Sequence, residues 1–222
     1  MNSRGGRLRK KPRPFSPPKC LWVFMGKLKK VAIFVDWESI RLGIFEEAET
    51  KLTKKINYNQ TDILIKFIKS FLDEQREEIY RIFFYLADPF GDILRGVDYS
   101  KTPTYRHATS LMDRLAVTEF IALRKGSLVV RGFDKNNNPI FIQKKVDMLL
   151  GLDIAHVSYN KLVERVLILS ADTDIVPAMK TARINGLQVI LGICPDVQTD
   201  IHRELKEHSD IIREIPFQKI FP

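Results

Sequence analysis

Acidic side chains stand at the ends of two short apolar runs of the sequence. Asp36 directly follows the run 31–35, and Asp172 lies three residues beyond the run 166–169. Runs of this length and β-branched content are typical of strands buried on both faces of a parallel sheet. In such a sheet the ligand site lies beyond the carboxyl ends of the strands. If these two strands are neighbours, we expect both acids at the same edge of the sheet.

Two further acids are expected near this edge. Asp174 follows Asp172 by two residues, and Asp147 lies near the start of a segment of helical periodicity, 145–159. Carboxylates about 4 Å apart repel by roughly 4 kcal/mol per pair at an effective dielectric constant of 20. A group of three or four therefore normally holds a divalent cation or has raised pKa values. Oxygen ligands without histidine or cysteine favour Mg²⁺ or Mn²⁺ over zinc, and these ions promote phosphoryl chemistry.

Each acid also has a simpler structural explanation. Asp or Ser after a strand is a common N-cap of the next helix, worth about 1 kcal/mol. Helix capping is a sufficient explanation for a single acid, whereas several carboxylates gathered at one edge of the sheet indicate a bound cation. Glu38 and Ser39 follow Asp36 and are expected at the same edge, where either could orient a water molecule or a phosphate. Asp153 falls on the apolar face of the segment 145–159, so a structural hydrogen bond is expected for it.

The elements that would position these acids indicate an α/β fold. Apolar runs alternate with segments of helical spacing, which predicts a three-layer sandwich of helices around a mostly parallel sheet. Strands are predicted at 31–35, 79–87, 166–169 and 187–192, helices at 62–73, 108–125, 145–159 and 174–184, a long loop at 88–108, and a small β-hairpin insertion at 127–132 and 140–143.

Composition excludes several other classes of protein. The chain has 222 residues, 45% of them apolar, which is enough for a full-sized core. The run 20–25 is too short for a membrane helix or a signal-peptide core. Two cysteines, Cys20 and Cys194, are too few for a disulfide framework, and no Gly-rich phosphate loop follows a strand. We expect a cytoplasmic protein with reduced thiols and no membrane contact.

The positive charge of the chain lies in its first thirty residues. The net charge is +9, yet residues 1–30 hold ten basic residues and no acid, which leaves 31–222 with a net charge of −1. Four prolines in this part predict a flexible basic tail at 1–29, followed by one domain at 30–222. Such a tail could bind a phosphate backbone through counterion release, or it could be a solvated extension without function.

The segments around the acids, taken together, resemble the NYN domain, a branch of the PIN-like (FLAP-nuclease-like) superfamily of metal-dependent ribonucleases. The resemblance is carried by the order and spacing of 31–40 (VAIFVDWESI), 144–147 (KKVD), 169–177 (LSADTDIVP), 185–190 and 209–212. It implies that Mg²⁺ or Mn²⁺ is held, and catalysis performed, by Asp36, Asp147, Asp172 and Asp174. The implied substrate contacts are Ser39, Lys144, Lys145, Ser170 and Thr173.

Two positions depart from the usual residues of the family. The family commonly has Asn where Ser39 stands and Gly where Ala171 stands. A hydroxyl can donate one hydrogen bond but lacks the separate donor and acceptor atoms of an amide, and the extra methyl group could tighten the turn that holds Asp172. Both changes leave the four acids in place.

The resemblance implies hydrolysis of RNA phosphodiester bonds by a water molecule activated at the metal. RNA is therefore the expected partner, and further phosphate contacts are expected from the basic tail and from Arg95, Lys101 and Arg106. Two alternatives stay open. One is a module of the same fold that binds RNA or a protein without cleaving it, which the departures at Ser39 and Ala171 favour. The other is a phosphohydrolase of small nucleotides. A homodimer is also left open.

Overall fold

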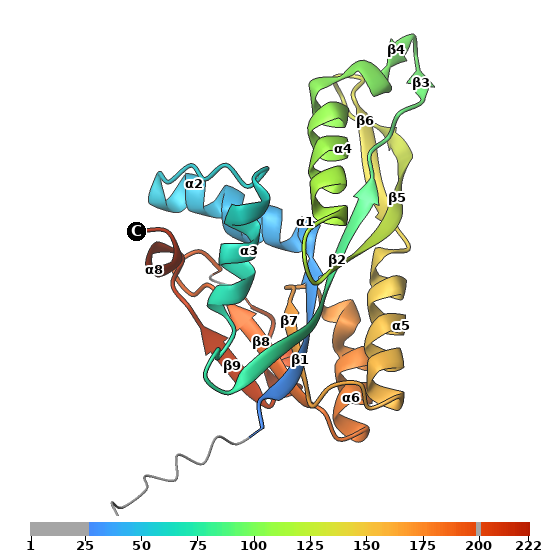
Figure 1. Ribbon diagram of the computed structural model, residues 1–222. Coiled ribbons are helices and arrows are strands. Elements are labelled where there is room, and N and C mark those ends of the chain that lie inside the picture. The colour runs from blue at the N-terminus through green and yellow to red at the C-terminus, as the bar shows by residue number, and fades with distance from the viewer. Residues whose placement is uncertain (1–26, 199–200) are drawn as a thin grey trace, which may run out of the picture.

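A seven-stranded sheet forms the centre of the computed structural model, which describes residues 27–198 and 201–222 (Figure 1). The strand order is β6–β5–β2–β1–β7–β8–β9, and every neighbouring pair except β5–β6 is parallel. The strands are β1 (Lys29–Asp36), β2 (Glu77–Asp88), β5 (Ile121–Phe133), β6 (Pro139–Lys144), β7 (Arg165–Leu169), β8 (Gln188–Ile193) and β9 (Ile211–Glu214). The tail predicted at 1–29 lies, up to residue 26, outside the described residues.

Helices cover both faces of the sheet, which confirms the predicted α/β architecture. Along β1, Ile33 and Val35 belong to one hydrophobic core, whereas Ala32 and Phe34 belong to the other, because successive side chains of a strand point to opposite faces. One core is closed by α1 (Trp37–Ile40), the π-helical η1 (Arg41–Glu46), α2 (Glu47–Leu52), α3 (Thr61–Ser70), α4 (Pro103–Ala116) and α8 (Phe217–Ile220). The other is closed by α5 (Val146–Tyr159), η3 (Thr173–Ile175), α6 (Val176–Ile184) and α7 (Arg203–Glu207).

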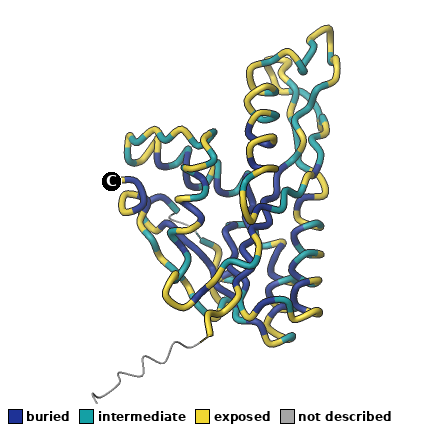
Figure 2. Tube along the Cα trace, viewed as in Figure 1, coloured by how far each residue is buried: buried dark blue, intermediate teal, exposed yellow. Residues whose placement is uncertain are grey.

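The burial pattern follows this layering. Figure 2 shows buried residues along the central strands and exposed residues on the outward faces of the helices. Among the described residues, no helix is both long and apolar enough to span a bilayer. The condition for a shared acidic edge is also met, since β1 and β7 are adjacent parallel strands with Val35 paired to Leu169.

The helix predicted at 108–125 is wrong in its second half. Helix α4 ends at Ala116, and β5 begins at Ile121 and pairs in parallel with β2, with Ile82 opposite Ile121. The residues 121–125 have no strong local preference for a strand, and the tertiary pairing with β2 overrides their helical compatibility. As a consequence, Arg124 and Lys125 belong to the sheet.

The predicted long loop at 88–108 contains more structure than expected. It holds the short antiparallel pair β3 (Ile93–Leu94) and β4 (Val97–Asp98), the 3₁₀ turn η2 (Tyr99–Lys101) and the first turn of α4. The Thr102 hydroxyl caps α4 by accepting a hydrogen bond from the Tyr105 N–H at 3.2 Å, and Pro103 occupies the first helical position. This Thr-Pro pair is a helix-start signal that the sequence analysis missed.

The predicted β-hairpin is formed by β5 and β6, which pair antiparallel from Ser127–Lys144 to Phe133–Pro139. It is continuous with the central sheet, because the first half of β5 pairs with β2 and the second half with β6. Figure 1 shows this hairpin beside α4, with the β3–β4 pair at its far end. The hairpin and α4 thus form one side of the space above the carboxyl end of β1.

Candidate metal centre and adjoining cleft

The carboxyl ends of β1 and β7 are joined by side-chain hydrogen bonds. The Ser170 hydroxyl, just beyond β7, donates to Oδ2 of Asp36 at the end of β1, with a distance of 3.0 Å. The Ser39 N–H donates to Oδ1 of Asp36 at 3.4 Å. Asp36 and Ser170 are both buried, so the bond is shielded from water. Asp36 therefore accepts a hydrogen bond on each of its two oxygens. It is also the N-cap of α1, as the structural explanation for an acid after a strand predicts.

The turn after β7 is ordered by a second group of hydrogen bonds. The Asp172 N–H donates to the Ser170 hydroxyl at 3.1 Å, and the Asp174 N–H donates to Oδ1 of Asp172 at 2.9 Å. The Ala171 N–H donates to the Ser39 hydroxyl at 2.8 Å. The hydroxyl at Ser39, where the family commonly has Asn, thus accepts a backbone hydrogen bond that ties the two turns together.

Three of the four predicted acids form a compact carboxylate cluster. One carboxylate oxygen from each of Asp147, Asp172 and Asp174 lies within 4.8 Å of the others. Asp147 comes from the first turn of α5, and the other two come from the turn at the end of β7. Asp36 is outside this cluster and is buried beside it. In the described part of the chain, none of the four acids forms an ion pair with a basic side chain.

Burial and mutual repulsion raise two of the carboxyl pKa values. Burial raises the pKa of Asp36 to about 6, against the lowering effect of the hydrogen bonds from Ser170 and Ser39, and the charges of Asp147 and Asp172 add to the rise. Asp147 is exposed, yet its pKa is raised by partial desolvation of the carboxylate and by the charges of Asp172 and Asp174. A cation among these groups would relieve the repulsion.

The donor set fits a hard divalent cation. All available ligand atoms are carboxylate oxygens, and the cluster contains neither a histidine nor a cysteine. Mg²⁺ and Mn²⁺ prefer such oxygen ligands, whereas zinc prefers nitrogen and sulfur. Asp147, Asp172 and Asp174 could therefore hold a metal ion.

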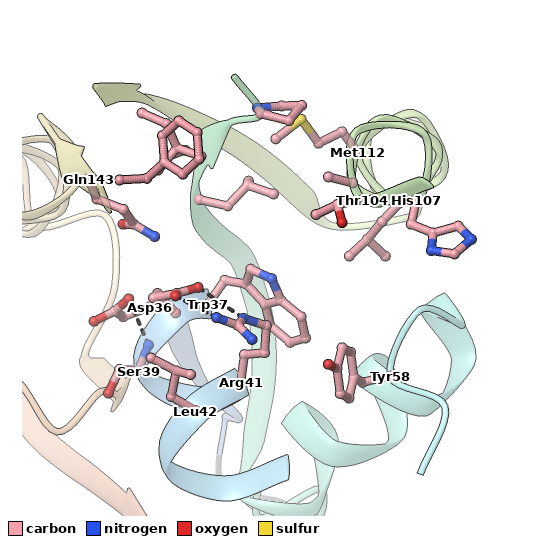
Figure 3. A pocket seen from close by; sticks show the side chains of 18 of the residues that line it. Asp36, Trp37, Ser39, Arg41, Leu42, Tyr58, Thr104, His107, Met112 and Gln143 are labelled. Atoms are coloured by element: carbon pink, nitrogen blue, oxygen red, sulfur yellow. Dashed lines mark hydrogen bonds and ion pairs between the residues drawn. The ribbon is translucent and has the colours of Figure 1, made fainter. Parts of the chain in front are cut away.

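A cleft of about 800 Å³ adjoins these acids, and Asp36, Asp147 and Asp172 line it. One wall is formed by the segment after β1 and the approach to α3, with Trp37, Arg41, Leu42, Tyr58 and Asn59. The opposite wall is formed by α4 and the β5–β6 hairpin, with Thr104, His107, Ala108, Leu111, Phe141 and Gln143. In Figure 3, Asp36 and Ser39 lie at one end of the view, Tyr58 and His107 at the other, and Trp37 and Arg41 between them.

The remaining predicted substrate contacts are absent from the lining of the cleft. Lys144 and Lys145 are exposed, and Lys145 precedes α5 with a left-handed φ of 74°. Thr173 begins η3 between the two acids of its turn. In the long segment after β2, Lys101 pairs with Asp98 at 2.9 Å, and the Arg95 guanidinium lies 3.4 Å from the centroid of the Phe133 ring. Arg106 is exposed on α4.

Arg41, whose guanidinium lines the cleft, was not among the residues expected near the acids. It donates to Glu38 twice, from Nε to Oε2 at 3.0 Å and from Nη2 to Oε1 at 2.6 Å, and it also pairs with Glu46. Glu38, expected to orient water or phosphate, is thus engaged with this cation. Arg41 follows Glu38 by three residues, a spacing that lets side chains pair on one face of a helix, so the sequence carried a signal for this ion pair. No local sequence pattern predicts that α4 lies across the cleft from Arg41.

Asp153 accepts the structural hydrogen bonds expected for it, and the donors are side chains. The Tyr85 hydroxyl donates to Oδ2 of Asp153 at 2.8 Å, and Arg124 donates from Nε to the same oxygen at 2.7 Å. Tyr85 lies on β2 directly opposite Asp36 of β1, and Arg124 lies opposite Tyr85 on β5. The network therefore attaches α5, the helix that carries Asp147, to β2 and β5.

These features define an α/β protein with an acidic centre at the carboxyl edge of its sheet. The sequence profile of the NYN domain matches residues 30–213, so the chain belongs to the NYN domain family, which confirms the resemblance. This family is generally nuclease-like. A crystal structure of a protein of unknown function from Vibrio parahaemolyticus is similar in fold, with a TM-score of 0.50 and 16% identity over 86% of this chain and 94% of that chain. No curated protein matches the sequence.

Proposed function

We propose that this protein is a metal-dependent ribonuclease that hydrolyses phosphodiester bonds of RNA. The observation that carries the proposal is the cluster of Asp147, Asp172 and Asp174 at the carboxyl edge of an NYN domain. Three carboxylates within 4.8 Å of one another, without a basic partner in the described chain, repel one another, and a bound cation would relieve this repulsion. The open cleft beside them gives a polymer access to the cluster.

In this proposal the acidic residues hold Mg²⁺ or Mn²⁺, and the surrounding residues fix their positions. Asp147, Asp172 and Asp174 supply ligand oxygens, and Asp36 completes the site directly or through water. When bound, such an ion lowers the pKa of water and neutralises charge on a phosphate. Ser170 holds Asp36 and the Asp172 N–H at once, and the Ser39 hydroxyl holds the turn at Ala171.

Positive charge outside the centre would hold the RNA backbone. Lys144 and Lys145 are exposed next to Asp147, and the basic residues of 1–29 would add contacts that weaken as salt increases. RNA as the partner, a homodimer and a cytoplasmic location stay predictions of the sequence analysis.

The test is cleavage of a labelled mixed-sequence RNA, single-stranded and duplex, with Mn²⁺, with Mg²⁺ or with EDTA. Asp36→Asn and Asp172→Asn should abolish a metal-dependent cleavage that wild type performs. Asp113→Asn is the matched control, because Asp113 is an exposed acid on α4 outside the cleft lining. Cleavage that persists in EDTA or in both site variants would contradict the proposal.

A second candidate function is a binding module that does not cleave RNA. The observation that favours it is the Ser39 hydroxyl, which is engaged with the Ala171 N–H at a position where the family commonly has Asn. RNA binding without cleavage in any metal would support this module. Hydrolysis of mononucleotides without cleavage of the polymer would instead point to a phosphohydrolase of small nucleotides.

A further inference from the structure

We propose that helix α5 is a dimerisation surface, on which a second copy of this chain packs with its own α5. The outer stripe of this helix consists of Met148, Leu152, Ala155 and Tyr159. Met148, Leu152 and Tyr159 have 61%, 59% and 69% of their surface exposed. This surface is separate from the cleft, and the proposal does not depend on the proposed activity.

The outer stripe lies opposite the buried side of α5. The core contains Val146, Leu150, Ile154 and Val157, so apolar residues occupy two opposite sides of this helix. Helices that are apolar all round are normally buried. Figure 1 shows α5 at the edge of the molecule beside α6, and in the described part of the chain neither core includes a residue of the outer stripe. The stripe is thus apolar surface that the described fold leaves uncovered.

The spacing of the outer stripe indicates that its occupant is another helix. Its members follow one another by four, three and four residues, which is the spacing of the apolar positions in a coiled coil. In such a row each side chain inserts between residues of a facing helix. The positions that flank the row hold no acid, lysine or arginine: they are Leu149, Gly151, His156 and Ser158. A phosphate backbone would find no cation on this stripe, whereas an apolar helix would fit it.

A second copy of α5 matches the outer stripe when the two helices run antiparallel. A two-fold axis between Leu152 and Ala155 places Leu152 of each copy opposite Ala155 of the other, and Met148 opposite Tyr159. A large side chain then faces a small one, as close packing requires, and a thioether faces an aromatic ring. A two-fold contact must be complementary to itself. The outer stripe meets this condition, because it has no charges that would meet their own kind across the axis.

The size of the outer stripe indicates a reversible dimer. From Met148 to Tyr159 the helix extends about 16 Å, at about 1.5 Å per residue. Stable interfaces bury about 800 Å² per partner, which a contact of this length does not reach, so we expect a micromolar dissociation constant. Asp147 lies in the first turn of α5, so the antiparallel pair would hold the two carboxylate clusters at opposite ends of the contact.

The test is sedimentation velocity of the full-length protein at about 1–100 μM, the range expected for a small interface. We expect the average sedimentation coefficient of wild type to rise from the monomer value towards the dimer value with concentration. Leu152→Glu and Ala155→Lys should each stay monomeric, because each places a charge in the apolar contact. Ile93→Glu is the matched control, since Ile93 on β3 is 73% exposed and lies at the far end of the β5–β6 hairpin, and this variant should dimerise as wild type does (Figure 1).

A mixture of the two α5 variants tests the antiparallel arrangement. In a mixed dimer the carboxylate introduced by Leu152→Glu lies opposite the ammonium group introduced by Ala155→Lys, and the unchanged leucine and alanine meet at the other pair. We expect the mixture to dimerise at least about tenfold more tightly than either variant alone. A mixture that stays monomeric would overturn the proposal, as would wild-type dimerisation of Leu152→Glu alone. A monomeric wild type would also overturn it and leave a helix of another protein as the occupant.

Discussion

The Ser170 hydroxyl donates a 3.0 Å hydrogen bond to Oδ2 of Asp36, across 134 positions of sequence and between two adjacent strands. The same oxygen of Ser170 accepts the Asp172 N–H at 3.1 Å. One small side chain therefore sets the relative positions of a buried acid and of the turn that carries two members of the carboxylate cluster. Several consequences of this arrangement can be measured.

Replacing Ser170 by alanine should weaken both the fold and the proposed activity. Ser170→Ala removes a donor to Asp36 and an acceptor for Asp172, which we expect to cost about 1–3 kcal/mol of unfolding free energy. It should also raise the pKa of Asp36 further, since this hydrogen bond holds that pKa down. Urea unfolding and metal-dependent cleavage would be measured together, with Ser110→Ala as the control on exposed α4 surface. Wild-type stability in Ser170→Ala would contradict the prediction.

Replacing Asp36 by asparagine should stabilise the metal-free protein at high pH. The folded pKa of Asp36 is about 6, above its usual 3.8, so the folded state favours the protonated acid. Stability is therefore fully retained below the unfolded pKa and declines as pH rises through the folded pKa. Asp36→Asn removes this decline. The variant should therefore be about as stable as wild type at about pH 4, and its unfolding free energy should exceed that of wild type by about 1–3 kcal/mol at about pH 8.

The measurement for Asp36→Asn is urea unfolding in EDTA across this pH range, compared with Asp113→Asn. A gain that is independent of pH, or a loss of stability at high pH, would show that Asp36 carries no burial penalty. The expected gain at high pH, together with the expected loss of cleavage in the same variant, would show that stability is sacrificed for the proposed activity at this position.

Divalent metal should raise the melting temperature of wild type. Binding to the folded state alone stabilises by about 2.7 kcal/mol when the free ligand is at a hundred times its Kd. Asp147→Asn and Asp174→Asn each replace a carboxylate of the three-residue cluster by a neutral amide and should reduce or abolish this shift. Thermal unfolding with Mn²⁺, Mg²⁺ or EDTA checks this, and an equal shift in both variants and wild type would place the metal elsewhere.

The three members of the Tyr85–Asp153–Arg124 network should contribute unequally to the free energy of unfolding. Burial and the charge of Asp153 raise the pKa of Tyr85 above its usual value, so the phenol stays a donor at every working pH. Tyr85→Phe loses one hydrogen bond, at a cost of about 1 kcal/mol, and leaves the Arg124–Asp153 pair in place. Asp153→Ala leaves the Tyr85 hydroxyl and Arg124 without their partner and should cost about 3 kcal/mol or more. Equal costs, measured by denaturant unfolding, would contradict this order.

The local patterns of the sequence predicted most of the elements that carry the acids. Strands β1 and β7 were predicted because a run of apolar β-branched residues is compatible with burial on both faces, wherever the strand lies in the sheet. The acids that follow them were predicted because capping and ligand binding both occur where strands end. The predicted helices 62–73, 145–159 and 174–184 correspond to α3, α5 and α6, whose periodicity is contained within each segment.

Only the tertiary structure decided which of these residues meet. The pairing of β5 with β2 turned a segment that was predicted as helix into sheet, because a strand is stabilised by partners far away in the sequence. The same pairing placed Arg124 beside Asp153, and α4 across the cleft from Trp37. Local periodicity records which face of a segment is buried but not what covers it. The sequence by itself therefore determined the acids and their strand ends, and the sheet order determined the cluster and the cleft.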